Sequence, residues 1–215
     1  MLLHPTPLRR LAASNTALLL LDAQRYATSR EHGLGLAARE RAITREFDEY
    51  YSMAEAALGN MSRLLAAARR QGALVVHALL MDRGPGTVSR QLALAGLPLP
   101  QGDPLAELCA EVAPQSGEVI LPRGGYGCFA ATQLDAQLAA RGIERVVICG
   151  MLANITVVLA AREAADCGYA VVVVQDAAAS ETLDWHAVTM LGIAGGLIRV
   201  HWADEVIEML EGTRT

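Results

Sequence analysis

The sequence has no cluster of cationic residues, and this bears on its partners. Its 18 Lys and Arg residues are scattered along 215 residues, and the formal net charge is −5. Nucleic-acid binding depends on grouped Lys and Arg side chains that contact phosphates. We therefore expect no nucleic-acid partner.

Long apolar runs are also missing. No stretch of about 18 uninterrupted apolar residues occurs, so the sequence predicts no transmembrane helix and no membrane partner. The beginning of the chain, MLLHPTPLRRLAASN, has no basic region followed by an apolar one. We therefore expect no signal peptide.

Metal-binding patterns are absent as well. Cys109, Cys128, Cys149 and Cys167 show no CxxC spacing, and the five histidines form no HxH, HxxxH or HExxH cluster. The sequence thus predicts no metal and no cofactor. Unpaired cysteines are typical of reduced thiols, so we expect a cytoplasmic protein.

What the sequence does contain is an alternation of short apolar runs with helical patterns, in a chain whose residues are 53% apolar. Runs rich in β-branched residues are typical of buried parallel strands, and the helical patterns between them end beside glycines. The alternation predicts a parallel sheet with helices on both faces, and the length suits a single domain over residues 1–215. The predicted strands are 16–22, 73–80, 118–122, 145–150, 170–176 and 196–201, and the predicted helices are 50–71, 130–141, 154–167 and 184–194.

Two long segments interrupt this alternation. Residues 23–49 are polar, and residues 82–103 are rich in Gly and Pro. Each segment leads back into the same alternation, so neither is a linker between domains. We interpret them as insertions over one rim of the sheet, or as arms that reach a neighbouring subunit.

Polar residues follow the predicted strands, where open α/β sheets bind ligands. Asp22 ends the first strand. Its apolar surroundings predict a raised pKa, which suits proton transfer; the alternative is an aspartate that only caps the following turn. Arg123 stands in a glycine-flanked loop after the third strand, where its guanidinium can bind a ligand anion or the Asp22 carboxylate. The alternative is an ordinary surface arginine. Thr156 enters the helix after the fourth strand.

Several stretches together carry a resemblance to a known family: LLLLDAQ, GYGCFAATQLDAQL, RGIERVVICGMLAN, AREAADCGY and VVVVQDAAAS. With these in order, the chain resembles the isochorismatase-like (cysteine hydrolase) family over roughly residues 15–207. The resemblance implies a three-layer α/β/α fold with a six-stranded parallel sheet, and a homo-oligomer. It also implies a non-proline cis peptide near Met151–Leu152.

For the amide-hydrolysing members of this family, the resemblance implies an Asp–Lys–Cys triad. Asp22 matches the aspartate, Arg123 stands at the lysine position six residues before Phe129, and Thr156 stands at the cysteine position six residues after Gly150. A threonine hydroxyl is a far weaker acid than a thiol, and Arg123 stays protonated and cannot serve as a base. We therefore expect Thr156 to be a helix-entry hydroxyl or a hydrogen-bond donor to a ligand, rather than a covalent nucleophile.

Three functions stay open at this point. The first is an isochorismatase-family hydrolase in which Asp22 catalyses hydrolysis of a small anionic substrate as an acid and Arg123 holds the anion. This follows from the resemblance, because the isochorismatases of the family lack the cysteine. The second is a catalytically silent member that binds a small molecule or acts as a scaffold. The third is an amide or ureide hydrolase that uses Thr156 or water.

The candidate catalytic residues are thus Asp22, Arg123 and Thr156. Backbone N–H groups of residues 153–156 are expected to bind an oxyanion at the helix start. Cys128 is a second candidate for a nucleophilic thiol, at a different position from the family cysteine, but we expect its side chain to pack in the core. The residues expected to contact a small-molecule substrate are Gln24, Tyr26, Tyr126, Phe129, Leu152, Ala153 and Asn154.

Overall fold

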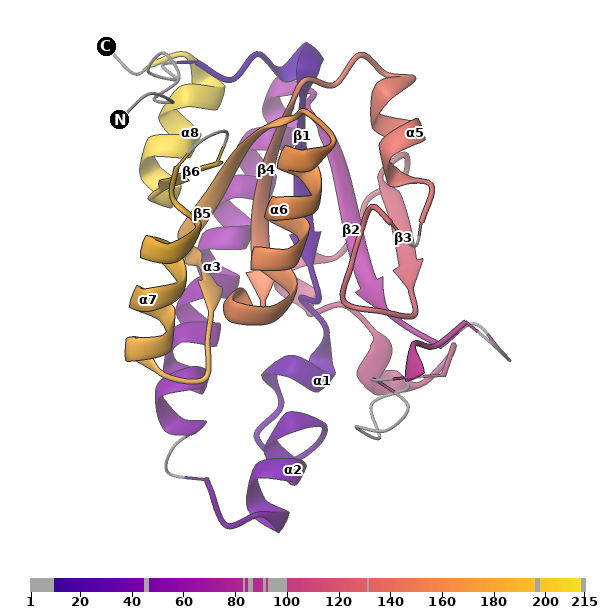
Figure 1. The fold of residues 1–215 in the computed structure, drawn as a ribbon, viewed down its shortest axis with the longest axis vertical. Helices are drawn as coiled ribbons and strands as arrows, with labels where there is room; N and C mark the ends of the chain where they lie inside the picture. The colour runs from indigo at the N-terminus through magenta and orange to yellow at the C-terminus, as the bar shows by residue number, and fades with distance from the viewer. Residues whose placement is uncertain are drawn as a thin grey trace.

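In a computed structural model, a six-stranded parallel sheet lies between two layers of helices (Figure 1). The structure describes residues 10–44, 47–82, 84, 87–90, 92, 100–130, 132–195 and 198–213. The predicted three-layer α/β/α fold with six parallel strands is confirmed. Residues 1–9, where no signal peptide is expected, and much of segment 82–103 lie outside the described residues.

The strand order across the sheet is β3-β2-β1-β4-β5-β6. The strand β1 lies near the centre, and all of its residues are buried because the sequence TALLLL faces a helix layer on each side. The strands are β1 (Thr16–Leu21), β2 (Leu74–Leu80), β3 (Val119–Arg123), β4 (Arg145–Met151), β5 (Ala170–Ala179) and β6 (Ile198–His201).

Helices α5, α6 and α7 cover one face of the sheet, and α3 and α8 cover the other. Helix α3 supplies most of its layer, because small and apolar residues recur along one side of it at helical spacing. Among the described residues, none of the helices is both long and apolar enough to cross a membrane. The helices are α1 (Arg25–Thr28), α2 (Leu34–Glu40), α3 (Phe47–Gln71), α5 (Leu134–Ala139), α6 (Val158–Asp166), α7 (Leu183–Ile193) and α8 (Ala203–Glu211).

The carboxyl ends of the strands meet at one rim, which is the lower end of the sheet in Figure 1. Helices α1 and α2 belong to the predicted insertion 23–49 and lie beyond this rim. This placement agrees with an insertion over one rim. Contact of the segment with a neighbouring subunit stays a prediction.

The connection from β4 to α6 differs from the regular helix predicted for residues 154–167. One π-helical turn, Ala153–Val157, precedes α6, because the N–H groups of Ile155, Thr156 and Val157 all donate to the carbonyl of Leu152, at 3.2, 2.9 and 3.3 Å. The cis peptide that the resemblance implies is present at Met151-Leu152. Thr156 is therefore carried by a widened first turn at the rim.

Strands β1 and β4 approach closely beside this turn. Gly150 has a φ of 142°, and a Cβ atom there would lie 2.1 Å from the carbonyl oxygen of Leu21. Only glycine fits such a contact. The close approach brings the turn after β4 next to Asp22, which directly follows Leu21.

Candidate active site

The first part of the site is a turn at Asp22 that directs its carboxylate across the end of β2. Asp22 has a φ of 50°, a left-handed conformation that Asp adopts more readily than most residues. Its N–H donates to the carbonyl of Ala78 at 3.0 Å, and its Oδ1 accepts a hydrogen bond from the N–H of Leu80 at 3.0 Å. The other carboxylate oxygen accepts a hydrogen bond from Arg123, the last residue of β3.

The Asp22–Arg123 ion pair is closed off from solvent, since both side chains are 0% exposed. Burial raises the pKa of Asp22, although the positive charge of Arg123 acts in the opposite direction. Burial disfavours the charged guanidinium of Arg123, yet the negative charge of Asp22 gives it a raised pKa. Arg123 is therefore not a surface arginine, and it is held as the cationic partner of Asp22.

One donor of Arg123 has no protein partner. Nη2 donates to Asp22 and Nη1 donates to the carbonyl of Gly125, whereas Nε is buried and has no hydrogen-bond partner. A buried donor without a partner costs about 1–3 kcal/mol. This N–H is thus suited to bind a ligand oxygen or a water molecule.

Thr156 is buried, and its hydroxyl is bonded to the backbone of the preceding turn. Oγ1 donates to the carbonyl of Met151 at 2.7 Å, with the carbonyl of Leu152 at 3.1 Å as a second acceptor. The same hydroxyl lies within reach of Asp22, and donation to that carboxylate would lower the pKa of Asp22. A hydroxyl has a single proton, so while Thr156 donates it to Met151 it does not donate it to Asp22. This is the arrangement expected of a helix-entry hydroxyl.

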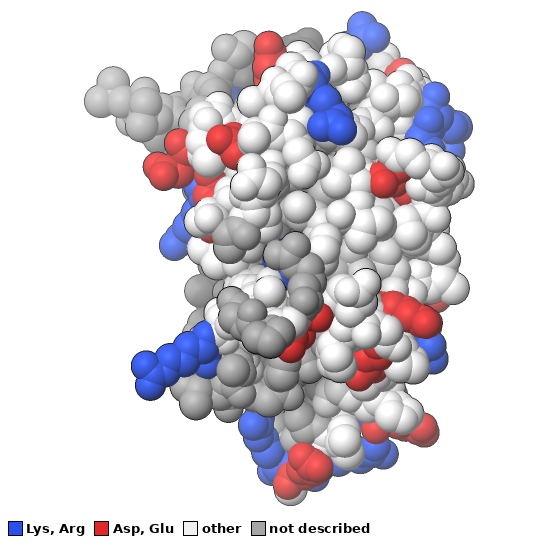
Figure 2. Space-filling model, turned by 90° about the vertical axis from the view of Figure 1, so that its right-hand side faces the viewer, with Lys and Arg blue, Asp and Glu red and all other residues white. Residues whose placement is uncertain are grey.

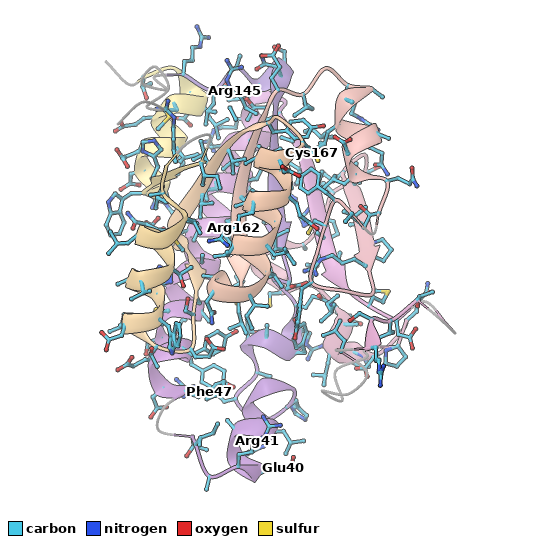
Figure 3. The ribbon with its side chains drawn as sticks, in the orientation of Figure 1. Glu40, Arg41, Phe47, Arg145, Arg162 and Cys167 are labelled. Carbon is cyan, nitrogen blue, oxygen red and sulfur yellow. The ribbon has the colours of Figure 1, made fainter. Side chains whose placement is uncertain are left out.

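None of the four cysteines is placed to act as a nucleophile beside Asp22 and Arg123. Cys128 is completely buried in the core, and burial raises its pKa to about 12. Burial also raises the pKa values of Cys109 and Cys149. Cys167 is exposed, but it lies after α6 at the upper end of the molecule, whereas the strands end at the lower rim (Figure 3).

A small cavity lies behind Leu80 and Thr156, which both lie within hydrogen-bond reach of Asp22, although neither Asp22 nor Arg123 lines it. Its volume is about 30 Å³, which corresponds to about one water molecule. Burial, with a smaller effect from the charge of Asp22, raises the pKa values of both Tyr26 and Tyr126, so both rings lie near the pair. The lining residues are Tyr26, Ala27, Leu80, Tyr126, Met151, Leu152, Ile155 and Thr156.

Of the residues expected to contact a substrate, Tyr26, Tyr126 and Leu152 line this cavity. Gln24 does not line the cavity, because its side-chain amide forms hydrogen bonds with backbone groups instead. Nε2 donates to the carbonyls of Leu80 and Ala106, at 3.2 and 2.7 Å, and Oε1 accepts from the N–H of Leu80 at 2.8 Å. Gln24 thus joins the end of β2 to the turn at Pro104–Ala106.

Three further expected contacts also lie outside the cavity lining. Phe129 packs on Tyr169 with ring centroids 5.9 Å apart, and Ala153 is buried in the core. Asn154 donates to Glu181 at 2.6 Å and so links the π-helical turn to the segment before α7. Two of the N–H groups expected to bind an oxyanion, those of Ile155 and Thr156, already donate hydrogen bonds to the carbonyl of Leu152.

Sequence analysis missed Glu163, a residue of α6 that holds the loop after Arg123. Its Oε2 accepts hydrogen bonds from the N–H groups of Cys128 and Phe129, at 2.8 and 3.0 Å. A Cβ atom on Gly127 would lie 2.6 Å from Oε1 of Glu163, so any larger residue there would displace the carboxylate that holds the loop. The motif AREAADCGY contains this carboxylate, but nothing in the sequence indicates its partners.

Two larger hollows lie away from the ion pair. One of about 290 Å³ is lined by Arg30 and Cys109 among others, and one of about 420 Å³ is lined by Arg69 and Glu118 among others. Their cations already have partners, because Arg30 contacts Asp48 at 2.9 Å and Arg69 contacts Glu118 at 2.7 Å. The small cavity next to Leu80 and Thr156 lies nearer the buried Asp22–Arg123 pair, whose Nε donor has no partner, and is the better candidate for chemistry.

Neither a metal centre nor a cationic surface stands out in the described part of the chain. No group of three or more His, Cys, Asp or Glu side chains there could hold a metal ion. On the face shown in Figure 2, the described basic side chains are scattered among acidic ones and form no patch.

Known proteins resemble this chain in both sequence and fold. The family model for the isochorismatase domain matches residues 16–201. A ureidoacrylate amidohydrolase, RutB, of Variovorax paradoxus is 33% identical over 192 residues, which cover 81% of this chain and 72% of that protein. A maleamate amidohydrolase of Pseudomonas putida is 33% identical over 142 residues, 64% of this chain and 67% of that protein. The crystal structure of a cysteine hydrolase from Pseudomonas syringae pv. phaseolicola superposes with a TM-score of 0.78 at 24% identity, covering 97% of this chain and 99% of that one.

Proposed function

The chain belongs to the isochorismatase family, and on this premise we propose that it hydrolyses a small anionic substrate without a protein nucleophile. In this proposal Asp22 transfers the proton, Arg123 binds an anionic or polarised oxygen of the substrate, and water attacks. One observation supports the proposal most. Leu80 and Thr156, which lie within hydrogen-bond reach of Asp22 in the buried Asp22–Arg123 pair, line a cavity that has no cysteine in its lining, and the Nε donor of Arg123 has no protein partner.

The position of Asp22 suits it to general acid catalysis. Burial raises the pKa of its carboxyl group, which brings proton transfer closer to neutral pH. The Leu80 N–H and Arg123 hold the carboxyl group in one orientation.

The proposed step balances without a co-reactant other than water. Protonated Asp22 gives its proton to the leaving atom as the bond from that atom to carbon breaks. The oxygen of a water molecule forms the new bond to this carbon. The proton that this water loses passes to the Asp22 carboxylate and restores the acid. Arg123 stays protonated throughout and stabilises negative charge on the substrate.

The relatives support a substrate with a carboxylate and an amide-type C–N bond. The names ureidoacrylate amidohydrolase and maleamate amidohydrolase both denote such substrates. A carboxylate or a carbonyl oxygen would satisfy the unpaired Nε donor of Arg123. We therefore infer that small carboxylate-bearing amides or ureides are the first class to test, with vinyl ethers as the second.

A second candidate function is favoured by the size of the cavity. Small-molecule sites usually measure about 300–1,000 Å³, whereas this cavity holds about 30 Å³. A catalytically silent protein that binds a small ligand, or acts as a scaffold, agrees with so closed a site. Hydrolysis requires that the residues around Tyr26 and Leu152 move apart to admit the substrate.

A substrate panel with two isosteric variants separates these functions. The purified protein is incubated with small amides, ureides and vinyl ethers that carry a carboxylate, and the products are measured by mass spectrometry. We expect turnover that Asp22→Asn abolishes and that Thr156→Val retains within about tenfold. Loss of all turnover in Thr156→Val would indicate a threonine nucleophile instead. No turnover, together with a rise in melting temperature on ligand addition, would favour the silent protein.

A further inference from the structure

Helix α1 separates two spaces of very different size. Its residues Tyr26 and Ala27 line the closed cavity of about 30 Å³. The next residue, Thr28, lines the half-open hollow of about 290 Å³, which we call the α1 hollow. Figure 1 shows α1 beyond the rim where the strands end. A helix of only four residues is thus the wall between a space too small for a substrate and a much larger one.

The α1 hollow gives this wall room to move. It lies between α1, helix α3 and the turn Ala110–Val112, and Ala54 and Leu58 of α3 are among its lining residues. Folded proteins are close-packed and hold few voids larger than a water molecule, so packed atoms normally block the movement of a helix. The hollow lets α1 move away from the cavity without such a clash.

The opposite walls of the cavity are held more firmly than α1. Leu80 and Met151 belong to the strands β2 and β4 and are fixed by the sheet. The carbonyl of Leu152 accepts three N–H groups of the π-helical turn, and the hydroxyl of Thr156 is bonded to the carbonyl of Met151. Of the walls of this cavity, α1 is therefore the one that can move at least cost.

Two tyrosines of α3 hold α1 in place. The hydroxyl of buried Tyr50 donates to the carbonyl of Ala27 at 2.6 Å and also lies 3.7 Å from the sulfur atom of Met151, on the opposite wall. The hydroxyl of Tyr51 donates to the carbonyl of Ser29 at 3.2 Å. Loss of one such hydrogen bond changes an opening equilibrium by about two- to tenfold.

We propose that α1 is the gate of the active site, which moves into the α1 hollow to admit the substrate, and that the Tyr50 hydroxyl latches it closed. This inference rests on the proposed function, because it supplies the opening that hydrolysis in so small a cavity requires. Gating by a short element beside a fixed scaffold is common among enzymes. The structure corresponds to the closed state, with Tyr50 in contact with both walls.

A thiol placed on the gate tests the movement without any substrate. Ala27→Cys adds one sulfur atom to a side chain that is 1% exposed and lines the cavity. Iodoacetamide reaches this thiol only while the gate is open, and peptide mass spectrometry gives its rate of alkylation. Cys149 is the internal control, because it is 0% exposed in the core and reacts only when the whole fold opens. The introduced thiol should react at least about tenfold faster than Cys149.

Substitutions on α3 should then change this rate in opposite directions. Tyr50→Phe removes the latch and should raise the rate by about two- to tenfold. Ala54→Leu and Leu58→Phe fill the α1 hollow and should each lower it by at least about twofold. Ala56→Leu is the matched control, because Ala56 is an exposed residue of α3 outside the lining of the hollow, and it should keep the rate.

Hydrogen exchange of the Arg25 N–H, which donates to the carbonyl of Glu107 at 2.9 Å, should rank the α3 variants in the same order without the introduced thiol. If circular dichroism shows that one of the two hollow-filled variants does not fold, the other decides. The proposal is overturned if the introduced thiol reacts no faster than Cys149, since α1 would then open only with the whole fold. An unchanged rate in Tyr50→Phe, or an undiminished rate in the folded hollow-filled variants, would overturn it as well. A gate that opens in a protein without turnover would contradict only the proposed hydrolysis.

Discussion

The guanidinium of Arg123 donates a hydrogen bond to the carboxylate of Asp22, 101 residues earlier in the chain, and both side chains are closed off from solvent. In the family triad, a lysine and a cysteine accompany this aspartate. Here the sequence contains no lysine at any position, and Thr156, which we expect at the cysteine position, has its hydroxyl bonded to the backbone. We propose this pair as the chemical centre of the site, and the predictions below test its parts.

Asp22→Asn should destabilise the fold, because it leaves the buried charge of Arg123 without a counter-charge. Breaking one partner of a buried ion pair costs about 3–5 kcal/mol. Asparagine keeps the shape, tolerates the positive φ and still accepts the hydrogen bond of the Leu80 N–H. Urea unfolding measures the loss, with exposed Asp166→Asn as a control that should stay within about 0.5 kcal/mol of wild type. Equal stability of Asp22→Asn and wild type would show that the pair carries no net charge interaction.

Glu118 should make the fold sensitive to acid. Burial favours the neutral form of Glu118, but hydrogen bonds from Arg69, from the N–H of Gln115 and from His77 lower its pKa from 4.5 to about 2. A lowered folded-state pKa contributes stability that is present above pH 4.5 and is lost as the pH falls toward 2. The shift corresponds to about 3 kcal/mol at neutral pH.

Glu118→Gln tests this contribution, but it also removes the hydrogen bond and charge by which Glu118 partly offsets the burial-lowered pKa of His77. The effect of Glu118 itself is therefore read below pH 4.5, where the stability gap between wild type and Glu118→Gln should close as the pH falls toward 2. Denaturant unfolding at a series of pH values measures the gap. A gap that does not change with pH would contradict the role of the charge.

Glu163→Ala should loosen the loop that follows Arg123 and carries Tyr126. The substitution removes the acceptor of the Cys128 and Phe129 N–H groups. Leaving a partly buried N–H without a partner costs about 1–3 kcal/mol. Hydrogen exchange at these two amides should accelerate by at least about tenfold, whereas Glu163→Gln, which keeps a carbonyl acceptor, should retain most of the protection. Unchanged exchange in Glu163→Ala would show that another group holds the loop.

Restoring the residues of the family triad should restore thiol chemistry. In protein carrying both Arg123→Lys and Thr156→Cys, a thiol at the helix start beside a cation would form a thiolate. We expect this double variant to hydrolyse amides of the panel, and intact-protein mass spectrometry should detect an acyl adduct on the introduced thiol. Thr156→Cys alone is the control and should be slower. A double variant without adduct or turnover would show that more than two residues separate this site from a cysteine hydrolase.

The sheet and the convergence of the main site residues could be predicted from the sequence. Apolar runs such as TALLLL are long enough and sufficiently β-branched or leucine-rich to indicate buried strands, and the ends of parallel strands share one rim. Asp22, Arg123 and Thr156 therefore lie together as expected.

The features that could not be predicted from the sequence depend on hydrogen bonds between distant segments. The amide of Gln24 bonds Ala106, 82 residues away, and so does not face the cavity. The partners of Glu163 and the π-helical turn at Leu152 likewise follow from long-range or irregular backbone contacts that have no period in the sequence. Helix α8 (Ala203–Glu211) was not predicted, although Asp176 accepts the hydrogen bond of the Ala203 N–H at its start at 2.7 Å.

The most direct test of hydrolysis without sulfur is the turnover of wild-type protein whose accessible thiols have been alkylated, measured beside Asp22→Asn on the same carboxylate-bearing amides and ureides. Exposed Cys167 will react, but it lies far from the cavity, so the alkylated protein should keep its rate within about twofold while Asp22→Asn shows none. Loss of turnover on alkylation, or a rate in Asp22→Asn equal to wild type, would contradict the account.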